Sequence, residues 1–210
     1  MKRKNKEKGV IIEFAGIDQS GKATQAKMLA DLLARRRRRH STFAFPDRQT
    51  PVGRLIDEIL TGKTSQHANK YLLSVLFAAN RYEKSNEIQS DVEDGKIVII
   101  DRYSESGVIY GQARFGFADK QAGNFLRLLE SGLPPADLVI WIDLPVTESF
   151  QRKRANRDLI EKDGHYLEKC RNYFDFASRQ DVRYQKIDGL ATPEKAHDQI
   201  ISILKEKKVI

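Results

Sequence analysis

The chain has 210 residues, 40% of them hydrophobic, and a formal net charge of +8 at pH 7. This length allows one sizeable hydrophobic core but not two full-sized domains, so we expect a single domain over residues 9–210 behind a basic, flexible tail at residues 1–8. The single cysteine, Cys170, excludes an intrachain disulfide, and the histidines show no spacing that indicates structural zinc. Glu13 interrupts the first apolar run, which argues against a signal peptide or membrane span there and favours a cytoplasmic protein without a membrane partner.

The positive charge is concentrated in two short segments. Residues 1–8 carry a net charge of +4 and residues 35–39 carry +5, so the rest of the chain is close to neutral at −1. We interpret the arginine run as the solvated last turn of a helix, where the helix dipole favours cations, with incidental binding of a polyanion as the alternative. A specific nucleic-acid partner is not expected.

Apolar runs with β-branched residues alternate with amphipathic segments along the chain. The runs predict strands at residues 10–14, 41–45, 97–100, 138–142 and 183–187. The periodicity between them predicts a helix across residues 70–92 and another with Thr192 as N-cap and Pro193 in its first turn. This alternation predicts an α/β fold with a five-stranded parallel sheet flanked by helices, whose ligands bind beyond the carboxyl ends of the strands.

A phosphate-binding loop follows the first predicted strand. Glycines at 16 and 21 allow consecutive amides and a helix N-terminus to point at phosphate oxygens, while Lys22 reaches the β- and γ-phosphates. A plain strand-to-helix turn is the alternative. Ala23 stands where the strict pattern has a hydroxyl ligand for Mg²⁺, so Thr24 or water must fill that position. The expected ATP-binding residues are Gly16, Asp18, Gln19, Ser20, Gly21, Lys22, Ala23 and Thr24.

A carboxylate follows the third predicted strand. Asp101 comes directly after an apolar run, where it can hold Mg²⁺ directly or through water, and Arg102 beside it can clamp a phosphate with paired donors. A surface aspartate that caps the next helix is the alternative. We therefore expect Asp101 and Thr24 at the metal and Arg102 at a phosphate, with Lys22, Asp101 and Arg102 among the catalytic residues.

Further motifs follow in the order and spacing of thymidylate kinases. They are Phe45-Pro46-Asp47-Arg48, Leu76-Phe77-Ala78-Ala79-Asn80-Arg81, Asp101-Arg102-Tyr103 with Ser106, Gly107 and Tyr110, and Gly132-Leu133-Pro134 with Asp137. With the P-loop, the chain therefore resembles the thymidylate kinase family over roughly residues 9–205. Ala136 departs from the family pattern, which has proline before the aspartate, but this position belongs to a loop.

The resemblance implies a fold of the P-loop NTPase type and transfer of the ATP γ-phosphoryl group to dTMP, giving dTDP and ADP for dTTP biosynthesis. It also implies a homodimer. Arg48 would bind the dTMP phosphate, Phe77 would stack on thymine, and Arg81 would donate to a base carbonyl. Asp18 would accept from the sugar 3′-hydroxyl, and Tyr110 would fill the space of a ribose 2′-hydroxyl. The expected substrate-binding residues are Asp18, Phe45, Arg48, Phe77, Arg81, Arg102, Ser106, Tyr110 and Gln112.

The resemblance also makes residues 152–164 a mobile lid over ATP. One subgroup of the family carries a catalytic arginine in the P-loop, where this chain has the neutral Gln19, so the cation is expected from Arg152, Arg154 or Arg157, with the last two ranked ahead. The dTMP phosphate, with a second pKa of about 6, needs no general base. Catalysis would therefore come from alignment, from the exclusion of water, and from Mg²⁺, Lys22 and the arginines.

Two alternatives stay open at the level of sequence. The acceptor could be another monophosphate such as dUMP or UMP. The chain could also be a nucleotide- or nucleic-acid-binding module that has lost catalysis, a reading that Ala23 and the arginine run motivate.

Overall fold

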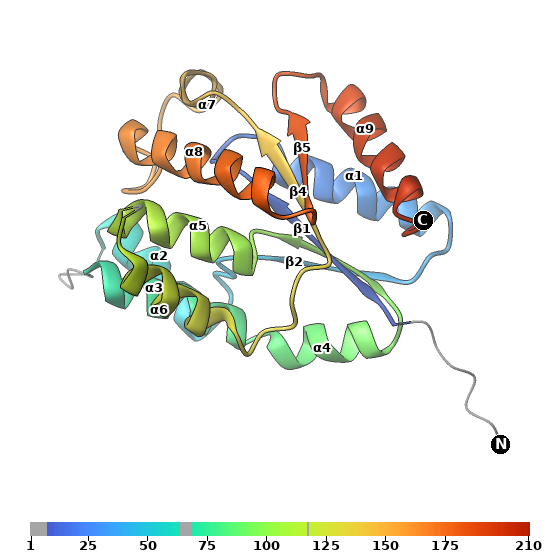
Figure 1. The fold of residues 1–210 in the computed structure, drawn as a ribbon, viewed down its shortest axis with the longest axis horizontal. Helices are drawn as coiled ribbons and strands as arrows, with labels where there is room; N and C mark the ends of the chain where they lie inside the picture. Colours follow the sequence, from blue (N-terminus) through green and yellow to red (C-terminus); the bar gives the residue numbers. More distant parts are fainter. Residues whose placement is uncertain (1–7, 64–68, 117) are drawn as a thin grey trace.

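A five-stranded parallel sheet with the strand order β2-β3-β1-β4-β5 forms the centre of the protein (Figure 1). The computed structural model describes residues 8–63, 69–116 and 118–210. The strands are β1 (Val10–Ala15), β2 (His40–Ala44), β3 (Ile97–Asp101), β4 (Leu138–Asp143) and β5 (Tyr184–Asp188). Each strand bound differs from the prediction by at most one residue, so the predicted α/β architecture is confirmed. Residues 1–7 of the expected tail lie outside the described residues.

Helices cover both faces of the sheet. In the part of the chain that the structure describes they are α1 (Lys22–Arg35), α2 (Pro51–Thr61), α3 (Lys70–Tyr82), α4 (Ser85–Glu93), α5 (Ser104–Phe115), α6 (Lys120–Glu130), α7 (Val146–Arg152), α8 (Gly164–Gln180) and α9 (Pro193–Glu206). Helices α1 and α9 pack on one face, α4, α5 and α8 pack on the other, and α2, α3 and α6 form a further layer beside α5 (Figure 1). None of the described helices is long and apolar enough to span a membrane.

The alternation of side chains along β1 separates two hydrophobic cores. Ile12 and Phe14 point into the core under α1 and α9, whereas Ile11 and Ala15 point into the core under α4, α5 and α8. Glu13 lies between Ile11 and Ala15 in the strand, so it shares their face, and it is fully buried. A carboxylate at the centre of the sheet needs strong polar partners, which are described below.

Helix starts and stops follow local signals in most places. The first helix ends at Arg35 with Arg36 as C-cap, as the arginine run predicted. Thr192 accepts a hydrogen bond from the Lys195 amide and caps α9, as predicted. The single helix predicted across residues 70–92 is wrong, because α3 ends at Tyr82 and a separate helix, α4, begins at Ser85. The Ser85 hydroxyl donates to the Tyr82 carbonyl at 2.9 Å at this break.

Candidate active site

The loop between β1 and α1 has the geometry of a phosphate cradle. Gly16 and Gly21 adopt φ angles of 137° and 103°, and a Cβ on Gly16 would lie 2.5 Å from the Ile142 carbonyl oxygen. No side chain of the described residues caps the N-terminus of α1, so its first amides stay available to an anion. The Lys22 ammonium donates to the Ile17 carbonyl at 2.7 Å, and burial lowers the pKa of Lys22 to about 8.

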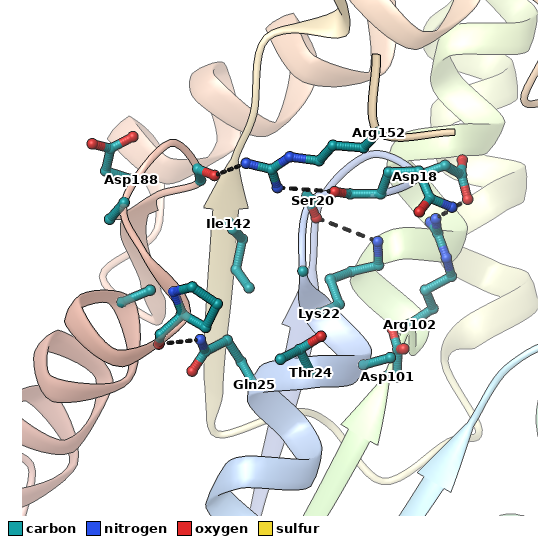
Figure 2. Close-up of a pocket in the computed structure, with 17 residues that line it drawn as sticks. Asp18, Ser20, Lys22, Thr24, Gln25, Asp101, Arg102, Ile142, Arg152 and Asp188 are labelled. Atoms are coloured by element: carbon teal, nitrogen blue, oxygen red, sulfur yellow. Dashed lines mark hydrogen bonds and ion pairs between the residues drawn. The ribbon is translucent and has the colours of Figure 1, made fainter. Parts of the chain in front are cut away.

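A cavity of about 510 Å³ opens above this loop (Figure 2). The P-loop forms its floor, and the segment between β5 and α9 forms one side with Asp188, Gly189, Ala191 and Pro193. Gln25 on α1 donates to the Pro193 carbonyl at 2.7 Å and so links α1 to the β5–α9 segment. The β5–α9 segment was missed in the sequence analysis, although it follows the carboxyl end of a strand and the rule that located Asp101 applies to it as well.

Asp101 and Thr24 line this cavity, as expected for the metal site. Asp101 Oδ1 is buried and has no hydrogen-bond partner among the described residues. Those residues also contain no group of three or more His, Cys, Asp or Glu side chains able to hold a metal. One orphaned carboxylate oxygen beside a hydroxyl fits Mg²⁺ that takes its remaining ligands from nucleotide phosphates and water, which is the usual composition of such sites.

The three lid arginines lie in different environments. Arg152 lines the cavity, where it donates to the Gln19 carbonyl at 3.2 Å and to the Gly189 carbonyl at 2.8 Å (Figure 2). Arg157 is 7% exposed, and its guanidinium donates to the Lys153, Glu161 and Ser149 carbonyls. Arg154 is exposed and lines neither this cavity nor the one beside it. The structure therefore brings Arg152 to the P-loop and does not bring Arg154 or Arg157 there.

A second cavity, of about 370 Å³, adjoins the first and shares Asp18 and Arg102 with it. Most of the expected substrate-binding residues meet here, and Gln112 is the exception among them. Those that line the cavity are Asp18, Phe45, Arg48, Phe77, Arg81, Arg102, Ser106 and Tyr110. Residues missed in the sequence analysis include Arg114, Glu130, Asp158 and Glu161. The position of Arg114 one helical turn after Tyr110 was a signal that could have identified it.

Asp18 and Arg102 form an ion pair where the two cavities meet. Arg102 Nη2 donates to Asp18 Oδ1 at 2.6 Å. Burial raises the pKa of Asp18, but Arg102 and Lys22 outweigh burial and hold this pKa below its usual value, so the carboxylate is ionised. The Tyr110 hydroxyl lies 3.4 Å from Asp18 Oδ2, which brings the ring expected to exclude ribose next to the expected sugar ligand.

Two of the expected substrate-binding residues, Arg81 and Ser106, are held by carboxylates of the protein itself. Arg81 forms a buried ion pair with Glu130, in which Arg81 Nε donates to Glu130 Oε2 at 2.8 Å. The Ser106 hydroxyl donates to Glu13 Oε1 at 2.7 Å, so this hydroxyl proton is committed to the core. By contrast, the Arg114 guanidinium lies 5.9 Å from the Phe77 ring centroid and 5.6 Å from that of Tyr166.

Arg48 lines the second cavity and remains largely exposed. Its guanidinium forms a 3.1 Å ion pair with Asp57, and 57% of its side chain is exposed. The buried Asn80 side chain holds this loop by accepting from the Asp47 amide at 2.8 Å and donating to Thr50 Oγ1 at 2.7 Å. Asn80 therefore stabilises the conformation of the loop that carries Arg48.

Comparison with known proteins points to thymidylate kinases. A family model described as thymidylate kinase matches residues 14–200. The chain is 30% identical over 205 residues to a thymidylate kinase of Plasmodium falciparum, covering 98% of this chain and 94% of the relative. It is 28% identical over 207 residues to that of Schizosaccharomyces pombe, covering 97% and 94%. The solved thymidylate kinase of Candida albicans superposes with a TM-score of 0.83 at 31% identity, covering 96% and 93%.

Proposed function

Since this chain belongs to the thymidylate kinase family and is an ATP:dTMP phosphotransferase, we propose that its two cavities hold the two substrates on either side of Asp18 and Arg102. The cavity above the P-loop would take ATP, and the cavity lined by Phe77 and Tyr110 would take dTMP. The observation that carries this assignment is that both cavities share the Asp18–Arg102 ion pair, so the two phosphate chains would meet there.

The chemistry needs alignment rather than a base. A phosphate oxygen of dTMP attacks the γ-phosphorus of ATP, a new P–O bond forms, the bond to ADP breaks, and dTDP and ADP leave. Lys22 and Arg102 supply positive charge on the two sides of the transferred group, and Asp101 with Thr24 would hold Mg²⁺. The ion would neutralise charge on the phosphates. Because the acceptor phosphate is largely a dianion at neutral pH, the enzyme has only to bind, orient and exclude water.

We further propose that Arg152 supplies the positive charge near the transferred phosphoryl group. In one subgroup of the family an arginine of the P-loop has this role, and this chain has the neutral Gln19 at that position. Arg152 is the lid arginine that contacts the P-loop and lines the ATP cavity. This proposal revises the order expected from the sequence, which favoured Arg154 and Arg157. Arg157 would instead stabilise the segment between α7 and α8 through its contacts with carbonyl oxygens.

A homodimer in the cytoplasm completes the proposal. Large apolar side chains are exposed on α3 and α6, among them Tyr71 at 51%, Val75 at 41% and Leu128 at 71%. Because α3 and α6 contact each other, these side chains can contribute to one surface that a second copy would cover. Light scattering that gives a monomer mass at micromolar protein concentrations would reject the dimer.

One assay tests the function. ADP release is followed with ATP and either dTMP, dUMP, UMP or CMP, with and without a chelator that removes Mg²⁺. We expect turnover with dTMP to exceed that with the other acceptors and to stop with the chelator. The Candida albicans enzyme is described as having broad substrate specificity, so the acceptor series is needed for this chain. ADP release without any acceptor at the same rate would contradict the proposal.

A further inference from the structure

Glu13 is an acidic side chain in an apolar environment. It lies in β1, the central strand of the sheet, and is 0% exposed. Its strand neighbours Ile11 and Ala15 on the same face belong to the hydrophobic core under α5 and α8. A carboxyl group there loses its hydration, so its oxygens must gain hydrogen bonds from the protein.

The partners of Glu13 all belong to one short segment of chain. Glu13 Oε1 accepts from the Tyr103 amide at 2.9 Å, from the Ser106 amide at 2.8 Å and from the Ser106 hydroxyl at 2.7 Å. Glu13 Oε2 accepts from the Glu105 amide at 3.1 Å. Tyr103 is the N-cap of α5, and α5 has no cap from its own N-cap side chain. The Glu13 side chain on β1 therefore caps the N-terminus of α5, although the two lie about 90 residues apart in sequence.

The same segment carries the dTMP cavity. Ser106, Gly107, Tyr110, Gly111 and Arg114 of α5 all line it. Because a helix moves as a rigid rod, the position of its first turn decides where these side chains stand. Several of them lie on successive turns of one helix face, so a small tilt at the start of α5 would displace the whole wall.

The backbone conformation of Arg102 is held by the same strand, β1. Its backbone adopts a φ of 63°, a left-handed conformation that costs free energy for a residue with a side chain. The Arg102 amide donates to the Phe14 carbonyl at 3.0 Å, and the next amide, that of Tyr103, donates to Glu13. Two adjacent residues of β1 therefore hold the chain at Arg102, which in turn forms the ion pair with Asp18.

We infer that Glu13 is a positioning residue for dTMP binding, because it fixes the first turn of α5 and thereby the places of Arg102 and Tyr110. This inference rests on the proposed assignment of the α5-lined cavity to dTMP. Glu13 does not line that cavity and has no contact with a substrate in this role. The neighbouring carboxylate of Glu105 has a different task, since it accepts from Arg183 at 2.8 Å and from the Tyr184 hydroxyl at 2.9 Å.

The test compares Glu13→Gln with Glu105→Gln at pH 8, above the pKa of about 7 of Glu13, so that both carboxyl oxygens of the parent are acceptors. In Glu13→Gln the side-chain oxygen can still accept from Tyr103 and Ser106, but its NH₂ group would face the Glu105 amide, and two donors would meet. We expect KM for dTMP to rise about tenfold or more, because a buried donor is left unpaired. KM for ATP should rise less, because the α5 residues line only the dTMP cavity and Arg102 alone reaches both. Glu105→Gln removes a carboxylate from the same turn without touching the cap, so its KM for dTMP should match the parent within about twofold.

A second measurement separates positioning from folding. Amide hydrogen exchange should show protection of the Tyr103, Glu105 and Ser106 amides in the parent and loss of that protection in Glu13→Gln, with β1 amides unchanged. If Glu13→Gln does not fold, Glu13→Asp keeps the charge with a shorter reach, and the same rise in KM for dTMP is expected. A folded variant with lowered Tm and the parent KM for dTMP would overturn the inference. A parent enzyme that does not phosphorylate dTMP would refute the proposed function instead.

Discussion

The guanidinium of Arg81 and the carboxylate of Glu130 form an ion pair in the wall of the second cavity, with only 4% and 8% of their side chains exposed. The pair joins α3 to the last residue of α6. Burial raises the pKa of Glu130, and the Arg81 charge opposes that effect. Arg81 can therefore act on a base only as one half of this pair, so the pair and not the arginine alone is the element to perturb.

Glu130→Ala should destabilise the protein by about 3–5 kcal/mol, because it leaves the Arg81 charge buried without a partner. Urea denaturation at neutral pH measures this change in the free energy of unfolding. Glu87→Ala is the matched control, since the Glu87 side chain is 58% exposed in its ion pair with Lys84. The control should cost less than about 1 kcal/mol. Equal effects of the two substitutions would show that the buried pair has no special role.

Lys22→Ala should lower kcat by at least about 10²- to 10³-fold, because the variant lacks the positive charge that stabilises the phosphates during transfer. Burial lowers the pKa of Lys22, so its charge does not stabilise the nucleotide-free fold, and the Tm without nucleotide should stay the same or rise. Steady-state kinetics and thermal unfolding measure the two effects. Lys27→Ala, whose side chain is 75% exposed, should alter neither. Near-normal kcat in Lys22→Ala would remove the P-loop from the mechanism.

Tyr110→Ala should relax the choice of sugar. The two substrates to compare are dTMP and ribothymidine 5′-monophosphate, which differ only by the 2′-hydroxyl. Because exclusion depends on the bulk of the ring, we expect Tyr110→Ala to raise the relative kcat/KM for the ribonucleotide by about tenfold or more, and Tyr110→Phe to change it little. If both variants keep the parent preference, another residue discriminates between the sugars.

Arg152→Ala should lower kcat by about 10³-fold or more, as expected for an arginine finger in cis. Arg154→Ala is the matched control from the same segment, with an exposed side chain, and should stay within about tenfold of the parent. Arg157→Ala should instead lower Tm, because the Lys153 and Glu161 carbonyls would lose their donor. Kinetics at saturating ATP and dTMP, with thermal unfolding, distinguish these outcomes. A drop in kcat in Arg154→Ala alone would restore the order expected from sequence.

Glu13 should give stability a specific pH dependence. Burial raises its pKa from 4.5 to about 7, and the nearby Glu105 adds to this effect, so the folded protein holds a proton that the unfolded chain releases near pH 4.5. This contribution to stability is full below pH 4.5 and is lost as pH rises through about 7, at a rate of up to about 1.4 kcal/mol per pH unit.

Urea denaturation of the parent and of Glu13→Gln between pH 5 and pH 8 measures this dependence. The free energy of unfolding of the parent should fall relative to that of the variant as pH rises, because only the parent has the titrating group. A constant difference across this range would mean that Glu13 has an ordinary pKa.

Local sequence patterns were enough to predict the architecture, which the structure confirms, and to suggest where the chemistry takes place. Five apolar runs predicted the strands within one residue, and glycines at 16 and 21 with Lys22 predicted the phosphate cradle. These features depend on local periodicity and on backbone conformations that few residues can adopt. The carboxyl-end rule then located Asp101 and Arg102, because every strand of a parallel sheet ends at the same edge.

Contacts between elements that are remote in sequence determine which of the predicted polar side chains are already engaged by the protein. Arg81 is held by Glu130 across 49 residues, and the Ser106 hydroxyl is held by Glu13 across 93. Arg157 is held by carbonyls of its own segment, whereas Arg152 reaches the P-loop across 133 residues. The residue type determines how many hydrogen bonds a side chain can make. Its partners depend on which elements lie close to it in space. Those elements are remote in sequence and come together only when the helices pack on the sheet.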